Sequence, residues 1–141
     1  MPFEWKTLKE ERLINALSQF STGCHSFEIM LNGFDCFPPR VIFIKVAENE
    51  KLRLLQSRLV QFCKTELNLF KANHKEQPFH PHVTVAFRDL KKSLFPQAWA
   101  EVVNQKLDQD FMANHLTLLK HNGKSWDIFK SFMFLSQPEG I

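Results

Sequence analysis

The sequence of 141 residues contains no tyrosine, only 3 cysteines and only 4 glycines, although it has 15 phenylalanines. The lack of tyrosine removes the phenol group from the candidate acids, bases and nucleophiles. No uncharged apolar run approaches the roughly 20 residues that a membrane-spanning helix needs. Residues 1–14 are charged and periodic, unlike a secretory signal peptide. These absences predict a protein of the cytoplasm.

The three cysteines, Cys24, Cys36 and Cys63, are an odd number at wide spacings, and no Cys-x-x-Cys pair is present. This pattern predicts reduced thiols and excludes both a disulfide framework and a typical structural zinc site. Hydrophobic residues make up 44% of the chain and charged residues 23%, which is ordinary for a globular protein. We therefore expect one domain over residues 1–141, and its net charge of +3 permits an anionic ligand.

Local patterns predict a mixture of helices and strands. Thr7 and Glu10 form a capping-box pattern before the first apolar stripe, Asn32-Gly33 predicts a turn, and Asn122-Gly123 predicts a hairpin. Apolar periodicity predicts helices over residues 8–20, 50–69 and 95–106, and strands over residues 27–31, 41–46, 82–87, 112–120 and 126–134. This order favours an α+β fold with a largely antiparallel sheet.

The stretch from Pro81 to Arg88 carries the clearest chemical pattern. On a strand, His82 and Thr84 would share one face about 6.6 Å apart, which suits an imidazole and a hydroxyl that contact one phosphate group. Arg88 would continue this polar face and could bind the same anion through its guanidinium. The opposite face would carry Val83, Val85 and Phe87, and we expect it to anchor the strand in the core.

A His-x-Thr pattern also occurs on solvent-facing strands without any function, so the short pattern is not specific. With Pro81 before it and Ala86-Phe87-Arg88 after it, however, the stretch resembles the second His-x-Thr motif of the 2H phosphoesterase superfamily. This superfamily includes the 2′-5′ RNA ligase and cyclic phosphodiesterase family. The segments 27–34 and 39–44 are similar to the middle hairpin of that family, and the later elements follow in the same order.

The resemblance implies a two-lobed α+β fold of mainly antiparallel sheets with flanking helices. It implies an activity on RNA or nucleotides with 2′,3′-cyclic or 2′-5′ phosphodiesters, with no metal ion and no other cofactor. Each lobe of the family contributes one His-x-Thr motif, so that one histidine acts as base and the other as acid. By this resemblance His82 is one proton-transfer residue, Thr84 holds the phosphate, and Arg88 is a candidate substrate contact.

The N-terminus departs from the family pattern. Pro2-Phe3-Glu4-Trp5 is similar to the run that follows the first His-x-Thr motif in the family. We therefore expect this chain to lack the N-terminal strand, helix and motif-bearing strand. Loss of one histidine of the pair would impair catalysis, and the uncovered sheet edges would favour a homodimer.

Two other histidines are candidates to replace the histidine of the first motif. His115 and Thr117 repeat the pattern literally, but a half-exposed structural strand that leads into the Asn122-Gly123 hairpin is the favoured interpretation. His80 would point away from His82 if the strand had already begun, and no third ligand completes a metal site with the two.

The aromatic residues Phe37, Phe79 and Phe95 could stack a nucleobase, but core packing is the expected role of each. Two further hypotheses for the whole chain stay open beside the enzyme. One is a module that binds phosphate or RNA without turnover, and the other is an interaction protein that pairs strands with another chain.

Overall fold

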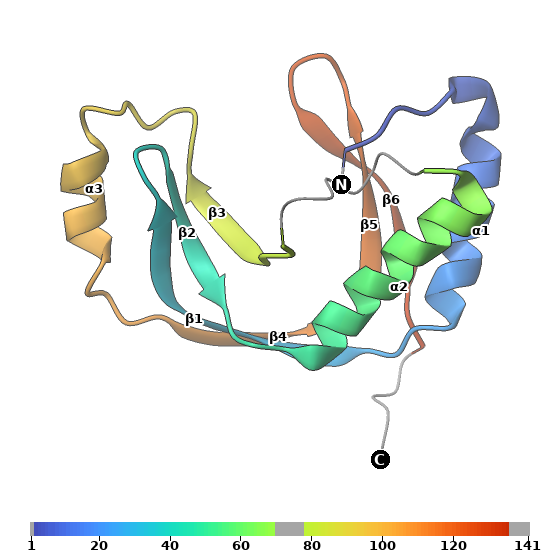
Figure 1. The fold of residues 1–141 in the computed structure, drawn as a ribbon, viewed down its shortest axis with the longest axis horizontal. Coiled ribbons are helices and arrows are strands. Elements are labelled where there is room, and N and C mark those ends of the chain that lie inside the picture. The colour runs from blue at the N-terminus through green and yellow to red at the C-terminus, as the bar shows by residue number, and fades with distance from the viewer. Residues whose placement is uncertain (1, 70–77, 136–141) are drawn as a thin grey trace. The chain divides into compact units, whose positions relative to one another are not determined.

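The computed structural model describes residues 2–69 and 78–135 (Figure 1). The elements are a 3₁₀ turn at Thr7–Lys9, α1 (Glu10–Thr22), β1 (Phe27–Phe37), β2 (Val41–Val46), α2 (Glu50–Leu67), β3 (His82–Ala86), α3 (Phe95–Val102), β4 (Asp108–Ala113), β5 (His115–His121) and β6 (Trp126–Met133). They form two compact units: Met1–Phe27, Lys51–Gln77 and Met112–Ile141 make the first, and Glu28–Glu50 and Pro78–Phe111 make the second.

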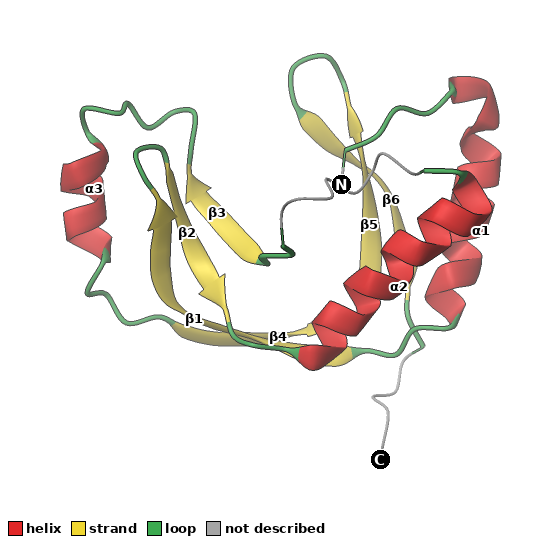
Figure 2. Ribbon diagram, viewed as in Figure 1, coloured by secondary structure: helices red, strands yellow, loops and turns green. Residues whose placement is uncertain are grey.

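The first unit packs α1 and α2 with the antiparallel hairpin β5–β6 (Figure 2). Apolar residues four positions apart place one face of each helix toward the core. The buried cluster consists of Leu13, Leu17, Cys63, Leu67 and Phe132. Burial raises the pKa of the Cys63 thiol, so this cysteine remains a protonated apolar group at neutral pH.

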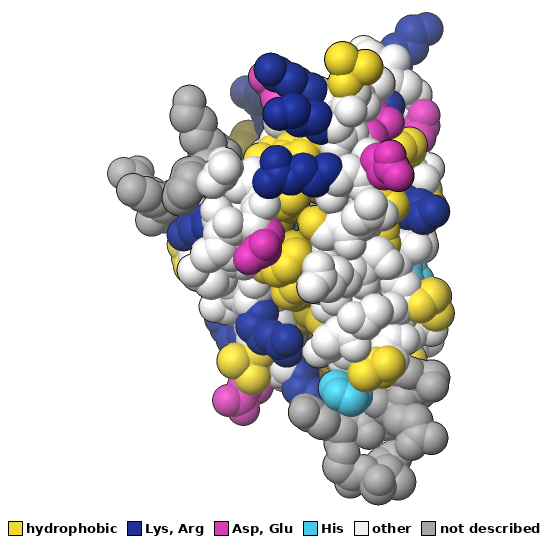
Figure 3. All heavy atoms as spheres, turned by 90° about the vertical axis from the view of Figure 1, so that its right-hand side faces the viewer, with side chains coloured by type: hydrophobic (Ala, Val, Ile, Leu, Met, Phe, Trp, Pro, Cys, Tyr) yellow, Lys and Arg dark blue, Asp and Glu magenta, His cyan; other side chains and the backbone are white. Residues whose placement is uncertain are grey.

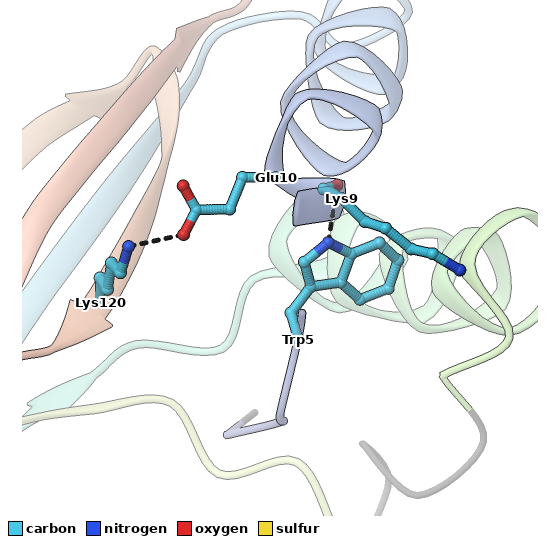
Figure 4. Close-up of polar contacts among 4 residues, drawn as sticks. All are labelled: Trp5, Lys9, Glu10 and Lys120. Atoms are coloured by element: carbon cyan, nitrogen blue, oxygen red, sulfur yellow. Dashed lines mark hydrogen bonds and ion pairs between the residues drawn. The ribbon is translucent and has the colours of Figure 1, made fainter. Parts of the chain in front are cut away.

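The start of α1 differs from the predicted capping box. Thr7 lies within a 3₁₀ turn, and Lys9 at the helix N-cap makes no side-chain hydrogen bond to the backbone. The Lys9 carbonyl instead accepts a bond of 2.8 Å from Trp5 Nε1, and Glu10 forms an ion pair with Lys120 of β5 (Figure 4). Thr7 and Glu10 therefore do not form the predicted capping box, and Glu10 pairs instead with a residue 110 positions away in the sequence.

The second unit is built on a four-stranded sheet in the order β3-β2-β1-β4, in which β2 pairs antiparallel with both β1 and β3. The predicted central position of Val41–Val46 is confirmed, since Ile42 and Phe43 are almost completely buried. Helix α3 connects β3 to β4 (Figure 1) and buries Phe95. The predicted α+β class is confirmed, with antiparallel sheets and flanking helices.

The Asn32-Gly33 pair does not end the first strand. β1 runs on to Phe37, and the pair forms an irregularity in the register between Leu31 and Phe34. Gly33 adopts φ +79°, which a residue without a Cβ takes up at little cost. A positive-φ residue can lie in a bulge within a strand as well as in a turn, and here β1 pairs with β2 on both sides of Gly33, which makes it a bulge.

Several boundaries also differ from the predictions. The segment 112–120 is divided at Asn114 between β4 and β5, and α3 ends at Val102 instead of residue 106. The Asn122-Gly123 hairpin is confirmed: Asn122 N–H donates to the Ser125 carbonyl at 2.9 Å, and Gly123 has φ +97°.

Within residues 2–69 and 78–135, no helix is both long enough and apolar enough to cross a membrane. On the face in Figure 3, Lys and Arg side chains are scattered among acidic and apolar ones and form no continuous basic surface.

Candidate functional site

Strand β3 places the predicted site residues. The rigid φ of Pro81 and the β-branched residues Val83, Thr84 and Val85 favour an extended backbone. β3 pairs with β2 on one side and is the edge strand of the sheet. Both His82 and Thr84 are exposed to solvent, so neither is sealed in the core.

The register places His82 and Thr84 on one face of the sheet. His82 lies opposite Lys45 of β2, and Thr84 lies opposite Phe43. Residues directly opposite in an antiparallel pair project from the same face, so these four side chains form a single surface. The predicted common face of the imidazole and the hydroxyl is therefore present.

A hydrogen bond orients the imidazole of His82. Its Nδ1 lies 2.6 Å from the backbone carbonyl oxygen of His80. A carbonyl only accepts, so Nδ1 carries the hydrogen and donates it. Nε2 is then the nitrogen that is left to exchange a proton with a ligand, because the hydrogen bond fixes the tautomer.

Aromatic rings surround His82 on this face. Its ring centroid lies 5.1 Å from that of Phe43, 5.5 Å from that of Phe37 and 5.6 Å from that of His80. Phe43, with 1% of its surface exposed, forms the floor of this cluster. The expectation that His80 points away from His82 was wrong, because residues two positions apart in an extended backbone share a face, and the two rings lie side by side.

The expected core role of the aromatic residues holds for Phe95, which is buried, and fails for Phe37. The Phe37 side chain is 42% exposed, and it lies next to the ring of His82. Phe37 is the last residue of β1, and its ring centroid lies 4.5 Å from that of the buried Phe43. An exposed ring of this kind is a surface on which a nucleobase can stack.

The opposite face of β3 is less buried than predicted. Val83 and Val85 are 42% and 51% exposed, and Phe87 is also exposed. Among the described strands, only β2 flanks β3, and solvent reaches these side chains. The strand is held mainly by its ladder to β2, not by an apolar anchor in the core.

Arg88 lies beyond the end of β3, in a turn. Strand alternation therefore does not place its side chain on the polar face. Its guanidinium carbon lies 5.6 Å from the centroid of the Phe87 ring, a cation–π contact. A role for Arg88 in anion binding stays a prediction.

Two charged residues on this face were not predicted from the sequence. Lys45 is exposed and lies opposite His82, and Asp35 of β1 is exposed and lies opposite Phe43. Burial, together with the charge of Asp35, raises the pKa of the neighbouring Cys36 thiol. Only the strand pairing reveals these neighbours, since they are distant from His82 in the sequence.

The second His-x-Thr pattern lies on β5 in the first unit. Leu116 and Leu118 pack against the core cluster, whereas His115 and Thr117 are exposed on the other face. His115 Nδ1 lies 2.6 Å from the side-chain oxygen of Asn114, which again leaves Nε2 available. The predicted strand leading into a hairpin is confirmed.

Among the residues that the structure describes, no group of three or more His, Cys, Asp or Glu side chains is arranged to hold a metal ion. The face around His82 presents an oriented imidazole, a hydroxyl and a cation. The imidazole and the hydroxyl suit an anionic ester, and the cation adds positive charge to the same face.

A comparison with known families identifies the superfamily of this chain. The family model described as "2'-5' RNA ligase superfamily" matches residues 1–125. The chain belongs to the 2′-5′ RNA ligase superfamily. The resemblance of the His82 stretch to the 2H phosphoesterases is thereby confirmed, and membership of the superfamily supports a phosphoesterase-type function.

Among solved structures, this superfamily member is similar to the crystal structure of TT0787 of Thermus thermophilus. The TM-score is 0.66 at 21% sequence identity, and the match covers 96% of this chain and 75% of that one. At this identity the similarity establishes the fold alone. A comparison with curated proteins finds no match.

Proposed function

We propose that the protein acts on RNA or nucleotides that carry a 2′,3′-cyclic or 2′-5′ phosphodiester, by hydrolysis or ligation. The observation that carries the proposal is the common exposed face of His82 and Thr84, with His82 Nδ1 bonded to the His80 carbonyl. His82 Nε2 exchanges the proton, and the Thr84 hydroxyl donates to a non-bridging oxygen. Neither step uses a cofactor.

In the hydrolytic direction, a water oxygen forms a bond to phosphorus while neutral Nε2 of His82 accepts one of its protons. The bond from phosphorus to the ribose oxygen breaks, and that oxygen receives a proton from a second acid. A water molecule serves as this acid, since His82 and Thr84 are both exposed to solvent. The non-bridging oxygens gain negative charge in the transition state, which a donated hydrogen bond from Thr84 stabilises.

The exposed ring of Phe37 supports a nucleotide as the ligand. It lies on the same side as the imidazole, and their ring centroids are 5.5 Å apart. A base stacked on Phe37 would place its ribose and phosphate near Nε2. Stacking of this kind tolerates different bases, so it supports RNA as a class without selecting a sequence.

The test is turnover of a 2′,3′-cyclic mononucleotide in buffer with EDTA. We expect His82→Ala to reduce the rate about 10²–10⁴-fold, as is typical when a general acid or base is removed. His115→Ala is the matched control, because it removes the other exposed histidine of a His-x-Thr strand. A His82→Ala variant as active as the native protein would disprove the assignment.

Two alternatives make different predictions in the same experiment. Binding of the nucleotide without turnover would favour a non-catalytic module for phosphate or RNA. Neither binding nor turnover, together with a concentration-dependent homodimer, would favour an interaction protein. The free edge of β3, with the exposed Val83 and Val85, is the observation that supports strand pairing.

A further inference from the structure

Lys45 occupies a distinctive place beside the proposed site. It lies in β2 directly opposite His82, and on its other side it faces the bulge of β1 at Gly33. A Cβ atom placed on Gly33 would lie 3.6 Å from Lys45 Cε and 4.0 Å from Nζ. The lysine side chain therefore extends over the glycine, toward β1 and away from β3.

The ammonium group of Lys45 is available to an anion. It is exposed, and it forms no hydrogen bond or ion pair with the residues that the structure describes. The acidic neighbour on this face is Asp35, which lies opposite Phe43, one step along the sheet from Lys45. Its Oδ1 accepts a hydrogen bond of 2.8 Å from the Cys36 N–H.

The spacing of the strands separates this cation from the reacting phosphate. Neighbouring strands lie about 4.8 Å apart, so β1 and β3 are separated by about 10 Å. A phosphate held by His82 and Thr84 lies over β3, whereas the ammonium group lies over β1. The distance suits two successive phosphates of an oligonucleotide better than one phosphate shared by all three residues.

We infer that Lys45 binds a second phosphate of the substrate, so that the preferred ligand is longer than one nucleotide. This inference rests on the proposed function, because it takes His82 and Thr84 as the site of the reacting phosphate. Gly33 contributes by leaving space for the lysine side chain. The face then selects oligonucleotides over cyclic mononucleotides through one additional charge contact.

The experiment compares two substrates for each variant: a 2′,3′-cyclic mononucleotide and a dinucleotide that ends in the same cyclic phosphate. Lys45→Met should raise KM for the dinucleotide roughly fivefold, the effect of one exposed charge pair, and leave kcat unchanged. KM for the mononucleotide should change less than about twofold. The advantage of the dinucleotide in the native protein should also decline as salt is added.

Two control variants test whether the effect depends on a positive charge and whether that charge must be at residue 45. Lys45→Arg keeps the cation and should retain the preference for the dinucleotide. Lys92→Met removes the same charge from the turn between β3 and α3 and should behave like the native protein. Equal losses with both substrates, or no loss with either, would overturn the inference and leave the role of His82 intact.

If the protein turns over neither substrate, Kd replaces KM. Binding of the dinucleotide and of the mononucleotide is then measured by calorimetry for the same variants. A selective loss with Lys45→Met would support the second phosphate site even where catalysis fails. Absence of binding for both ligands would overturn this inference together with the proposed function.

Discussion

At the scale of single residues, hydrogen bonds to fixed partners determine which side-chain atoms are available to a ligand. His82 gives Nδ1 to a backbone carbonyl two residues earlier, so the chain itself orients the ring. This bond needs no second side chain, and it keeps Nε2 directed away from its own backbone. An orientation of this kind lowers the entropic cost of holding a reactive group in place.

Two acidic residues of the second unit, Glu28 and Asp110, interact with each other. A side-chain hydrogen bond with Asp110, and then the charge of Asp110, raise the pKa of Glu28 above its usual value. The folded protein therefore holds this proton more tightly than the unfolded chain does. The stability that the pair contributes is complete below the unfolded pKa and is lost as the pH rises through the folded pKa.

This direction of the change in stability with pH gives a prediction for Glu28→Gln. At about pH 7 the charge of Asp110 opposes an ionised Glu28, so the variant should have a higher Tm than the native protein. The difference should become smaller toward about pH 3, because Glu28 takes up its proton as the pH falls through its raised pKa. Thermal unfolding monitored by circular dichroism at both pH values measures it. Glu101→Gln on the exposed side of α3 is the control and should show no such pH dependence.

At the scale of elements, the two Asn-Gly pairs show that the same local signal serves different structures. In both pairs the glycine has a positive φ, but Gly123 lies in the β5–β6 hairpin and Gly33 in a bulge within β1. β1 continues beyond Gly33 and stays paired with β2, whereas the chain reverses at Gly123. The requirement for glycine is local, and the structure that uses it depends on pairing.

Gly33→Ala should destabilise the protein by about 1 kcal/mol, because an alanine at this positive φ is strained. The neighbouring Lys45 atoms lie at ordinary contact distances from the added Cβ, so backbone conformation is the main cause. Urea denaturation measures the change. Gly23→Ala is the matched control: its φ of −92° is ordinary, and its added Cβ would lie 3.5 Å from the Phe20 carbonyl oxygen. Equal effects of the two substitutions would contradict this explanation.

At the scale of the whole molecule, each unit has its own core and its own exposed sheet surface. The first unit buries Phe132 among residues of α1 and α2, and the second buries Phe43 beneath the rings near His82. The strand β3 carries the site residues and stands at an edge of the sheet that the described strands form. Such an edge can pair with another strand.

We expect the protein to form a homodimer at high concentration through the free edge of β3. Val85→Lys places a charge on this strand and should shift the protein toward the monomer in sedimentation measurements. Leu8→Lys is the control, because Leu8 is fully exposed in the 3₁₀ turn and belongs to no sheet. A native protein that stays monomeric at every concentration would exclude this assembly.

The sequence alone determined the features that depend on neighbouring residues. The alternation of His82-Val83-Thr84 placed the two polar groups on one face, the apolar stripes located α1 and α2, and Asn122-Gly123 located the hairpin. The stretch around His82 also carried the family resemblance that the family comparison confirmed. Each of these signals acts over a few residues, within which backbone geometry follows directly from residue type.

The tertiary structure alone decided which distant residues meet. Strand pairing placed Lys45 opposite His82 and put β3 at an edge with Val83 and Val85 exposed, and β5 brought Lys120 to Glu10 at the start of α1. Register and burial arise from the summed contacts of segments far apart in the chain. For that reason the identity of the imidazole could be predicted from the sequence, but its neighbours could not.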